Sequence, residues 1–211
     1  LLNFESVAQS KYHLTAEDTL LIRFRMELSP NRAIEKIYLF RAGTYLIKSD
    51  IDFIGFNGLI TDNTYDISWE SGIRFVERNS VNEAGFSSAD IYYGDEKVVI
   101  DAPGDGEKIS RDFNGKVEWL AVRNKYFAVI MIPSDPTLVE GAYVEGQTTP
   151  THNLGLKEVY NVRLVVPFKG SDIERRSIDL YMGPVDYDLL KEISLNLTAL
   201  VDFGSFFGLK F

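Results

Sequence analysis

The chain has 211 residues, of which 45% are hydrophobic, and it carries a formal net charge of −9 and no cysteine. The missing cysteines exclude disulfides, thiolate nucleophiles and Cys-based metal sites. An acidic chain without a run of Lys and Arg lacks the basic face on which phosphate contacts depend, which argues against nucleic-acid binding. Its length fits one large β-sandwich or two small domains.

The first residues, Leu1-Leu2-Asn3-Phe4, already have the character of a strand and do not form a signal peptide. We therefore interpret the sequence as a piece of a longer protein. No stretch of the sequence is long and apolar enough to span a bilayer.

Alternating polar and apolar residues predict a half-buried strand at residues 20–28. Its inward face would be formed by Leu20, Ile22, Phe24, Met26 and Leu28. Two further strands, at residues 34–40 and 44–56, are separated by Arg41-Ala42-Gly43, which predicts a hairpin.

The middle of the chain is less regular. A short strand is expected at residues 65–69, and the polar stretch 74–88 is expected to be a long loop. Two more hairpins are predicted from their turn residues. The first joins residues 91–93 to 97–101, and the second joins residues 108–113 to 117–122 through Asn114-Gly115.

In the second half, the apolar run at residues 126–132 ends at Pro133, and its β-branched and aromatic content favours a buried strand over a buried helix. Further strands are expected at residues 138–145, 155–168 and 177–181, with a polar loop at 147–153. Pro167 is expected near the end of its strand, because proline cannot donate a ladder hydrogen bond. About a dozen short strands predict a mainly β fold, a large antiparallel sandwich.

The hydrophobic period changes to that of a helix at Asp186, which is a favourable N-cap residue. The sequence predicts one amphipathic helix that ends near Val201, because Gly204 lies just beyond. The predicted apolar stripe consists of Leu189, Leu190, Ile193, Leu197 and Leu200. We expect this stripe to pack on the sandwich, so that Ile193→Asp would bury an unpaired charge.

The chain ends in an aromatic tail that follows Asp202 and Phe203 and includes Phe206, Phe207 and Phe211. The tail could pack back onto the sheet, or it could begin a segment that lies in a membrane interface. We accordingly divide the chain into a sandwich (1–185), a helix and link (186–203) and the start of an interfacial segment (204–211).

Several motifs occur in a family order along the chain. They are Glu35 to Ile47, Trp69 with Gly72, Trp119-Leu120-Ala121-Val122 followed by Lys125-Tyr126-Phe127 and Ile132-Pro133, Leu180 to Pro184, and Val201-Asp202-Phe203-Gly204. This ordered set resembles the periplasmic domain of YidC-type membrane protein insertases.

The resemblance implies a β-supersandwich, like that of aldose mutarotases, on the periplasmic side of the bacterial inner membrane. It implies a non-catalytic scaffold without a cofactor, because the membrane groove of such insertases would lie beyond Phe211. The implied partners are the Sec translocon and its accessory subunits and nascent membrane proteins. On this interpretation, Leu189, Ile193, Leu197, Leu200, Asp202, Phe203, Phe206 and Phe207 form the junction, and the tail meets the membrane surface.

Two other interpretations stay open: a carbohydrate-binding or aldose-epimerase-like sandwich, and a generic cell-surface β-domain. An epimerase needs a histidine acid and a carboxylate base in one cleft. His13 is expected to point outward from a strand, and His152 lies in a polar loop with no carboxylate tied to it. Asp101, Asp105 and Glu107 lack a calcium-loop pattern, so no metal site is predicted.

Overall fold

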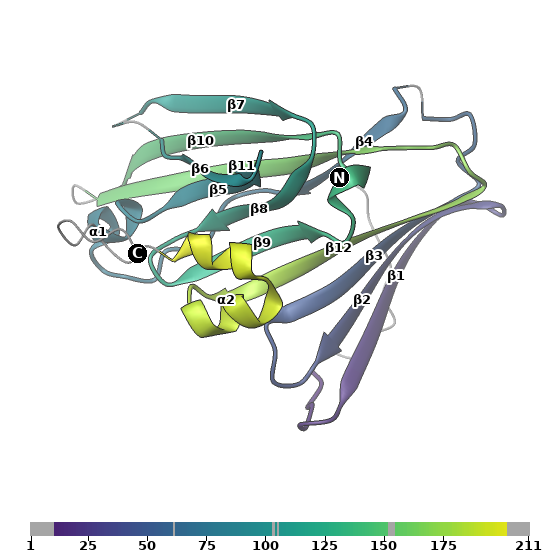
Figure 1. The fold of residues 1–211 in the computed structure, drawn as a ribbon, viewed down its shortest axis with the longest axis horizontal. Coiled ribbons are helices and arrows are strands. Elements are labelled where there is room, and N and C mark those ends of the chain that lie inside the picture. Colours follow the sequence, from purple (N-terminus) through teal and green to yellow (C-terminus); the bar gives the residue numbers. More distant parts are fainter. Residues whose placement is uncertain (1–10, 61, 103, 105, 152–154, 202–211) are drawn as a thin grey trace.

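The computed structural model describes residues 11–60, 62–102, 104, 106–151 and 155–201. Within these ranges, twelve strands form two antiparallel sheets (Figure 1), which confirms the predicted sandwich. The large sheet has the order β1-β2-β3-β12-β9-β8-β5-β6, and the small sheet has the order β4-β11-β10-β7.

The strands are β1 (Thr19–Ser29), β2 (Arg32–Arg41), β3 (Leu46–Ile54), β4 (Thr64–Trp69), β5 (Ser88–Tyr93), β6 (Glu96–Ile100), β7 (Lys108–Asn114), β8 (Val117–Arg123), β9 (Phe127–Pro133), β10 (Gly141–Thr151), β11 (Gly155–Pro167) and β12 (Ile173–Pro184). The helical segments are α1 (Ser80–Ala84), η1 (Pro136–Leu138), α2 (Tyr187–Ile193) and η3 (Leu195–Leu200). None of the described helices has the length and apolarity needed to cross a membrane.

The main core lies between the small sheet and the half of the large sheet around β8. Leu120 from β8 and Leu164 from β11 are both fully buried there. The opposite face of β8 and β9 is covered by α2 and η3 and carries a second cluster around Trp119 and Ile130. Because β9 is buried on both faces, its sequence is a continuous apolar run, and the strand predicted at residues 126–132 is confirmed.

The N-terminal strands extend the large sheet beyond the small one, and Figure 1 shows β1, β2 and β3 splaying away from β4. The predicted alternation in β1 is confirmed for Leu20 to Met26, since the inward residues are half-buried and their neighbours exposed. Leu28 was assigned wrongly to the inward face, because it is 55% exposed. A register shift between Glu27 and Ser29 rotates it outward.

The hairpin predicted at Asn114-Gly115 is wrong. β7 pairs with β10 in the small sheet, whereas β8 pairs with β5 and β9 in the large sheet. The two strands flank a tight turn, with Gly115 at a φ of 114°, but the turn carries the chain from one sheet to the other. Turn residues specify a reversal of direction and not the partner of the next strand.

Two strands are longer than the sequence predicts. The stretch 147–153, expected as a loop, continues β10 as far as Thr151, because every residue of β10 is paired with β11. The final strand runs over Ile173–Pro184 rather than residues 177–181, because β3 and β9 pair with it from both sides. The strand expected at residues 138–145 starts only at Gly141, after the short helix η1. Pro167 is the last residue of β11, as predicted.

The C-terminal helix is not continuous, which corrects the prediction of one helix to Val201. α2 ends at Ile193, Ser194 is extended at a φ of −161° and a ψ of 141°, and η3 follows. The Asn196 side chain donates a hydrogen bond of 2.6 Å to Glu118 Oε2 on β8. This tertiary bond holds the turn that separates the two helical segments.

Candidate functional site

The C-terminal junction, defined here as α2 and η3, packs on the outer face of the large sheet. Leu190, Leu197 and Leu200 are each fully buried. They contact side chains of β8, β9 and β12, namely Trp119, Ala121, Ala128, Ile130 and Tyr181. The predicted stripe therefore docks, but Leu190 is buried more deeply than Leu189 and Ile193, which are half-buried.

The start of the junction is held by its N-cap and by the turn between β8 and β9. The Asp186 carboxylate accepts hydrogen bonds of 3.0 Å from the backbone N–H groups of Asp188 and Leu189, so the predicted N-cap is confirmed. One residue earlier, Val185 N–H donates to the Tyr126 carbonyl at 2.8 Å. The helix therefore starts from a defined position beside the turn.

The end of the junction is held by a buried arginine. Arg123, the last residue of β8, donates a hydrogen bond of 2.6 Å from Nη1 to the Leu200 carbonyl. Since Leu200 is the last residue of η3, this bond ties the outgoing chain to the sheet. The predicted junction residues Asp202, Phe203, Phe206 and Phe207 lie outside the described residues.

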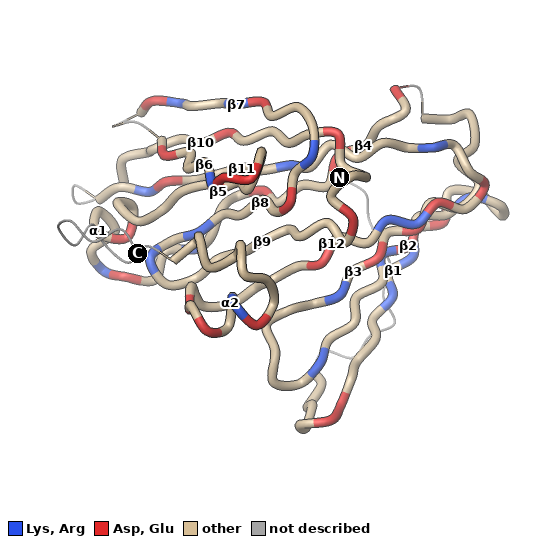
Figure 2. Tube along the Cα trace, in the orientation of Figure 1, with Lys and Arg blue, Asp and Glu red and all other residues tan. Residues whose placement is uncertain are grey.

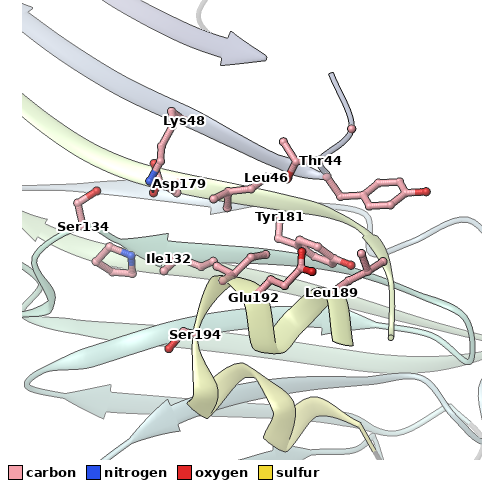
Figure 3. A pocket seen from close by; sticks show the side chains of 14 residues that line it. Thr44, Leu46, Lys48, Ile132, Ser134, Asp179, Tyr181, Leu189, Glu192 and Ser194 are labelled. Atoms are coloured by element: carbon pink, nitrogen blue, oxygen red, sulfur yellow. Dashed lines mark hydrogen bonds and ion pairs between the residues drawn. The ribbon is translucent and has the colours of Figure 1, made fainter. Parts of the chain in front are cut away.

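A pocket of about 510 Å³ opens between α2 and the start of β3 (Figure 3). We call it the junction pocket, and the polar groups that line it are Thr44, Tyr45, Lys48, Ser134, Asp179, Tyr181, Glu192 and Ser194. Leu189 and Ile193 line its helical wall. Leu189 and Ile193, two of the predicted site residues, thus lie beside polar groups that are distant from them in the sequence.

The junction pocket is suited to binding by hydrogen bonds. Lys48 and Asp179 form an ion pair across β3 and β12, and Figure 3 shows them together at one side of the pocket. The Tyr181 hydroxyl donates to the Pro184 carbonyl at 2.6 Å, and burial raises the pKa of Tyr181 to about 12. Lys48, Asp179 and Tyr181 thus each have a partner within the protein, and the Glu192 carboxylate and the exposed Tyr45 side chain also line the pocket.

A second, apolar groove of about 630 Å³ lies where β1, β2 and β3 diverge from β4. Its lining is dominated by Ile22, Phe24, Ile34, Tyr38, Phe40, Ile51, Phe53, Tyr65, Ile67, Trp69, Met131 and Leu180. Among the described residues, the buried Tyr65 hydroxyl has no hydrogen-bond partner, and burial raises its pKa. The inward residues predicted for the first strand, Leu28 apart, thus face this side of the sheet.

The stretch 74–88 was predicted to be a polar loop, but it contains α1 and a buried carboxylate. Glu83 is fully buried and accepts hydrogen bonds from Val76 N–H at 2.9 Å, Glu77 N–H at 2.8 Å and Asn124 Nδ2 at 2.8 Å. Asn79 caps the helix by accepting from Asn82 N–H at 3.2 Å. A signal was present in Asn79, a common N-cap residue, although the partners of Glu83 were not visible in the sequence.

Of the residues considered for enzyme or metal chemistry, the structure describes His13, Asp101 and Glu107, and none of these three lines the junction pocket or the apolar groove. His13 is exposed and lies in irregular chain rather than in the predicted strand, and it lines neither of the two pockets above. His152 and Asp105 lie outside the described residues. No group of three His, Asp or Glu in the described part of the chain is arranged to hold a metal ion.

Comparison with known proteins identifies the family. The family model of the YidC periplasmic domain matches residues 2–210. The chain belongs to this family. Membrane protein insertase YidC of Chlorobium phaeovibrioides is 31% identical over 191 residues, covering 90% of this chain and 32% of that protein. The corresponding protein of Chlorobium limicola is 31% identical over 205 residues, covering 96% of this chain and 34% of that protein.

The chain thus spans about a third of the length of the YidC proteins that it matches. The YidC periplasmic domain family is not a family of catalytic enzymes. A galactose mutarotase related enzyme from Lactobacillus acidophilus has a TM-score of 0.42 at 10% identity, covering 85% of this chain and 71% of that one. A heparan sulfate lyase from Pedobacter heparinus has a TM-score of 0.42 at 8% identity, covering 84% of this chain and 22% of that one.

Two of the motifs that resemble YidC have a structural explanation in this YidC periplasmic domain. Trp69 Nε1–H donates to the Gly72 carbonyl at 2.9 Å, which closes the turn after β4. Gly183 lies against Tyr45, so a Cβ at position 183 would come within 2.6 Å of the Tyr45 ring. Both motifs therefore support local packing.

Proposed function

We propose that this domain is a non-catalytic scaffold and interaction domain of a membrane protein insertase, on the periplasmic side of the bacterial inner membrane. The family match over residues 2–210 and the names of the relatives support this proposal. The parent protein would help to insert and fold inner-membrane proteins, alone or with the Sec translocon.

The observation that carries the proposal is the docked C-terminal junction. Three fully buried leucines and the bond from Arg123 to Leu200 hold the outgoing chain against the large sheet. A chain attached in this way leaves the sandwich at a set position. We propose that the sandwich of residues 1–185 thereby orients the link of residues 186–203, and that residues 204–211 lead into the membrane interface.

The two pockets suggest how partners would be bound. The apolar groove offers aromatic and aliphatic side chains to exposed apolar segments of nascent membrane proteins, which would be a weak chaperone-like contact. The junction pocket offers hydrogen-bonding groups beside α2, and we propose it for the Sec translocon or its accessory subunits. Phe206 and Phe207 would contact the membrane surface.

The proposal is tested with matched substitutions in η3 of the full-length parent protein. Leu197 is fully buried, whereas Leu195, two residues earlier, is 69% exposed. In cells depleted of their own insertase, Leu197→Asp should impair insertion of a dependent membrane protein, because a buried charge without a partner undocks the junction. Leu195→Asp should support insertion like the wild type.

Both variants must accumulate to the wild-type level, which an immunoblot of the membrane fraction measures. Limited proteolysis of Leu197→Asp shows whether its junction has come off the sheet. If the junction is undocked and insertion is still normal, the scaffold proposal is overturned. The carbohydrate-binding or epimerase-like alternative is not proposed, because His13 faces neither pocket and no described observation favours a sugar.

A further inference from the structure

One end of the sandwich carries five exposed apolar side chains, from α1, its flanking segments and the β8–β9 turn. We call it the aromatic end, and it consists of Val76, Val81, Phe86, Tyr126 and Phe127. Val76 is 65% exposed, and the other four are between 41% and 46% exposed. Exposed apolar side chains that occur together on one surface are typical of a contact surface, whereas isolated ones are common on any protein.

A lysine lies beside two members of the aromatic end, Phe86 and Tyr126. Lys125 Nζ lies 5.6 Å from the ring centroid of Phe86 and 5.1 Å from that of Tyr126. It also donates to Glu77 Oε1 at 3.1 Å and Asn82 Oδ1 at 2.8 Å, and the Tyr126 hydroxyl donates to the same Glu77 oxygen. These hydrogen bonds join the segment before α1 to the β8–β9 turn at the surface.

Beneath this surface the two segments are held by buried polar groups. Glu83 is fully buried, and its Oε1 accepts from Asn124 Nδ2 at 2.8 Å. Asn124 Oδ1 in turn accepts from the backbone N–H groups of Tyr126 at 3.0 Å and Phe127 at 2.9 Å. The aromatic end is therefore a built surface, since its backbone is fixed from below.

The chain leaves the sandwich at the same end. Arg123, which ties down Leu200, directly precedes Asn124 and Lys125 in the sequence. The Tyr126 carbonyl accepts from Val185, where the junction begins. Figure 1 shows α1 and the described end of η3 towards the same side of the molecule. The sequence that follows Val201 is aromatic, with four phenylalanines in its last ten residues.

We propose that the aromatic end rests in the headgroup region of a lipid bilayer. This inference rests on the proposed function, which places the domain beside a membrane. Tyr126 has an aromatic ring with a polar edge, and together with the neighbouring Lys125 it is of the kind that favours the membrane–water interface. The Phe and Val side chains would supply the apolar area that enters it. The exposed Arg74 and Arg78 precede α1 and would complement anionic headgroups in an otherwise acidic domain.

The test uses the 211-residue chain and vesicles of phosphatidylethanolamine and phosphatidylglycerol, with bound protein measured by flotation. Phe86→Ser/Phe127→Ser should lower the vesicle partition coefficient about tenfold, since two half-exposed rings no longer enter the interface. The matched control is Leu21→Ser/Ile173→Ser, which removes two side chains that are 56% and 67% exposed on β1 and at the far end of β12. The control should bind like the wild type.

A second pair, Val76→Ser/Val81→Ser, guards against misfolding of the first, and equal melting temperatures verify the fold. Phe206→Ser/Phe207→Ser separates the contribution of the tail to vesicle binding from that of the aromatic end. When Phe86→Ser/Phe127→Ser is added to this variant, the partition coefficient should still fall. Wild-type binding by both surface pairs would overturn the proposal, as would an equal loss in the control. The proposal would also be overturned if these pairs abolished self-association of the chain and left vesicle binding unchanged. In that case the aromatic end would bind a second copy of the chain rather than lipid. None of these results alters the insertion phenotype of Leu197→Asp, which tests the proposed function separately.

Discussion

The guanidinium of Arg123 reaches the carbonyl of Leu200 across 77 residues of sequence, with 2.6 Å between Nη1 and the oxygen. Both residues are buried, so the bond is shielded from water. It joins the end of β8, in the middle of the large sheet, to the last residue of η3. The end of η3 is therefore held against the large sheet by a contact between residues that are far apart in the sequence.

Removing this donor should loosen the junction. We expect Arg123→Met to lower the free energy of unfolding by about 1–3 kcal/mol, because the buried Leu200 carbonyl loses a charged donor. Amide hydrogen exchange of residues 195–201 should accelerate more than that of β8. Arg123→Lys keeps the charge and serves as the control, and equal exchange rates in wild type and Arg123→Met would contradict the role of the bond.

Replacing leucines of η3 by alanine should cost stability only where the leucine is buried. Leu197→Ala should destabilise the domain by about 2–5 kcal/mol, because it leaves a cavity against Trp119 and Ile130. Leu195→Ala, in the same helical segment, should change stability by less than about 0.5 kcal/mol, since that side chain is 69% exposed. Urea denaturation measures both, and similar losses for the two variants would show that η3 is not docked.

Adding a methyl group at position 183 should disturb the wall of the junction pocket. A Cβ on Gly183 would lie 2.6 Å and 2.7 Å from Tyr45 Cγ and Cβ, which are too near the backbone to move freely. We expect Gly183→Ala to cost about 1–3 kcal/mol in thermal or urea unfolding. Gly183→Ala/Tyr45→Ala removes the contact with the Tyr45 ring, although Tyr181 Cζ at 2.9 Å and the Cβ of residue 45 remain. The double variant should therefore lose less than the sum of the two single variants.

A buried carboxylate in the small sheet should make stability depend on pH. The Tyr160 hydroxyl donates to Glu158 Oε2 at 2.8 Å, and burial raises the pKa of Glu158 above its ordinary value. The folded domain thus holds this proton more tightly than the unfolded chain. The stability contributed by the proton is present at low pH and is lost as pH rises from the ordinary value through the folded pKa.

We therefore expect Glu158→Gln to gain stability over the wild type as pH rises through that window, because a neutral amide carries no desolvated charge and still accepts from Tyr160. Urea unfolding at a series of pH values measures the difference. Glu140→Gln removes an exposed carboxylate and is the matched control. A gain that does not vary with pH would exclude the titration of Glu158 as its cause.

The local patterns of the sequence predicted most elements. Alternation predicted β1, because side chains in a strand alternate between faces whatever its partner is. Turn residues predicted the hairpin of β2 and β3. The N-cap at Asp186 was also visible, since the backbone N–H groups that donate to its carboxylate lie only two and three residues away. Of the residues expected in the junction, Leu189, Ile193, Leu197 and Leu200 lie on α2 and η3, and the others lie outside the described residues. The most deeply buried residue of α2 is Leu190, which was expected in the stripe but not in the junction set.

The errors share a physical cause, which is the sequence distance between interacting residues. The break at Ser194 accompanies the bond between Asn196 and Glu118, which are 78 residues apart. The order in the stretch predicted as a loop depends on Glu83 and Asn124, which are 41 residues apart. Neither contact leaves a periodic signal.

The sequence alone was enough to determine the mainly β class, the approximate positions of the strands, and the resemblance to the YidC periplasmic domain. Only the tertiary structure decided that Asn114-Gly115 connects two sheets, that the C-terminal helix is interrupted at Ser194, and that Lys125 lies beside the exposed rings of Phe86 and Tyr126. The reason is that secondary structure follows from neighbours along the chain. Sheet membership, burial and surface clusters follow from which distant segments pack together.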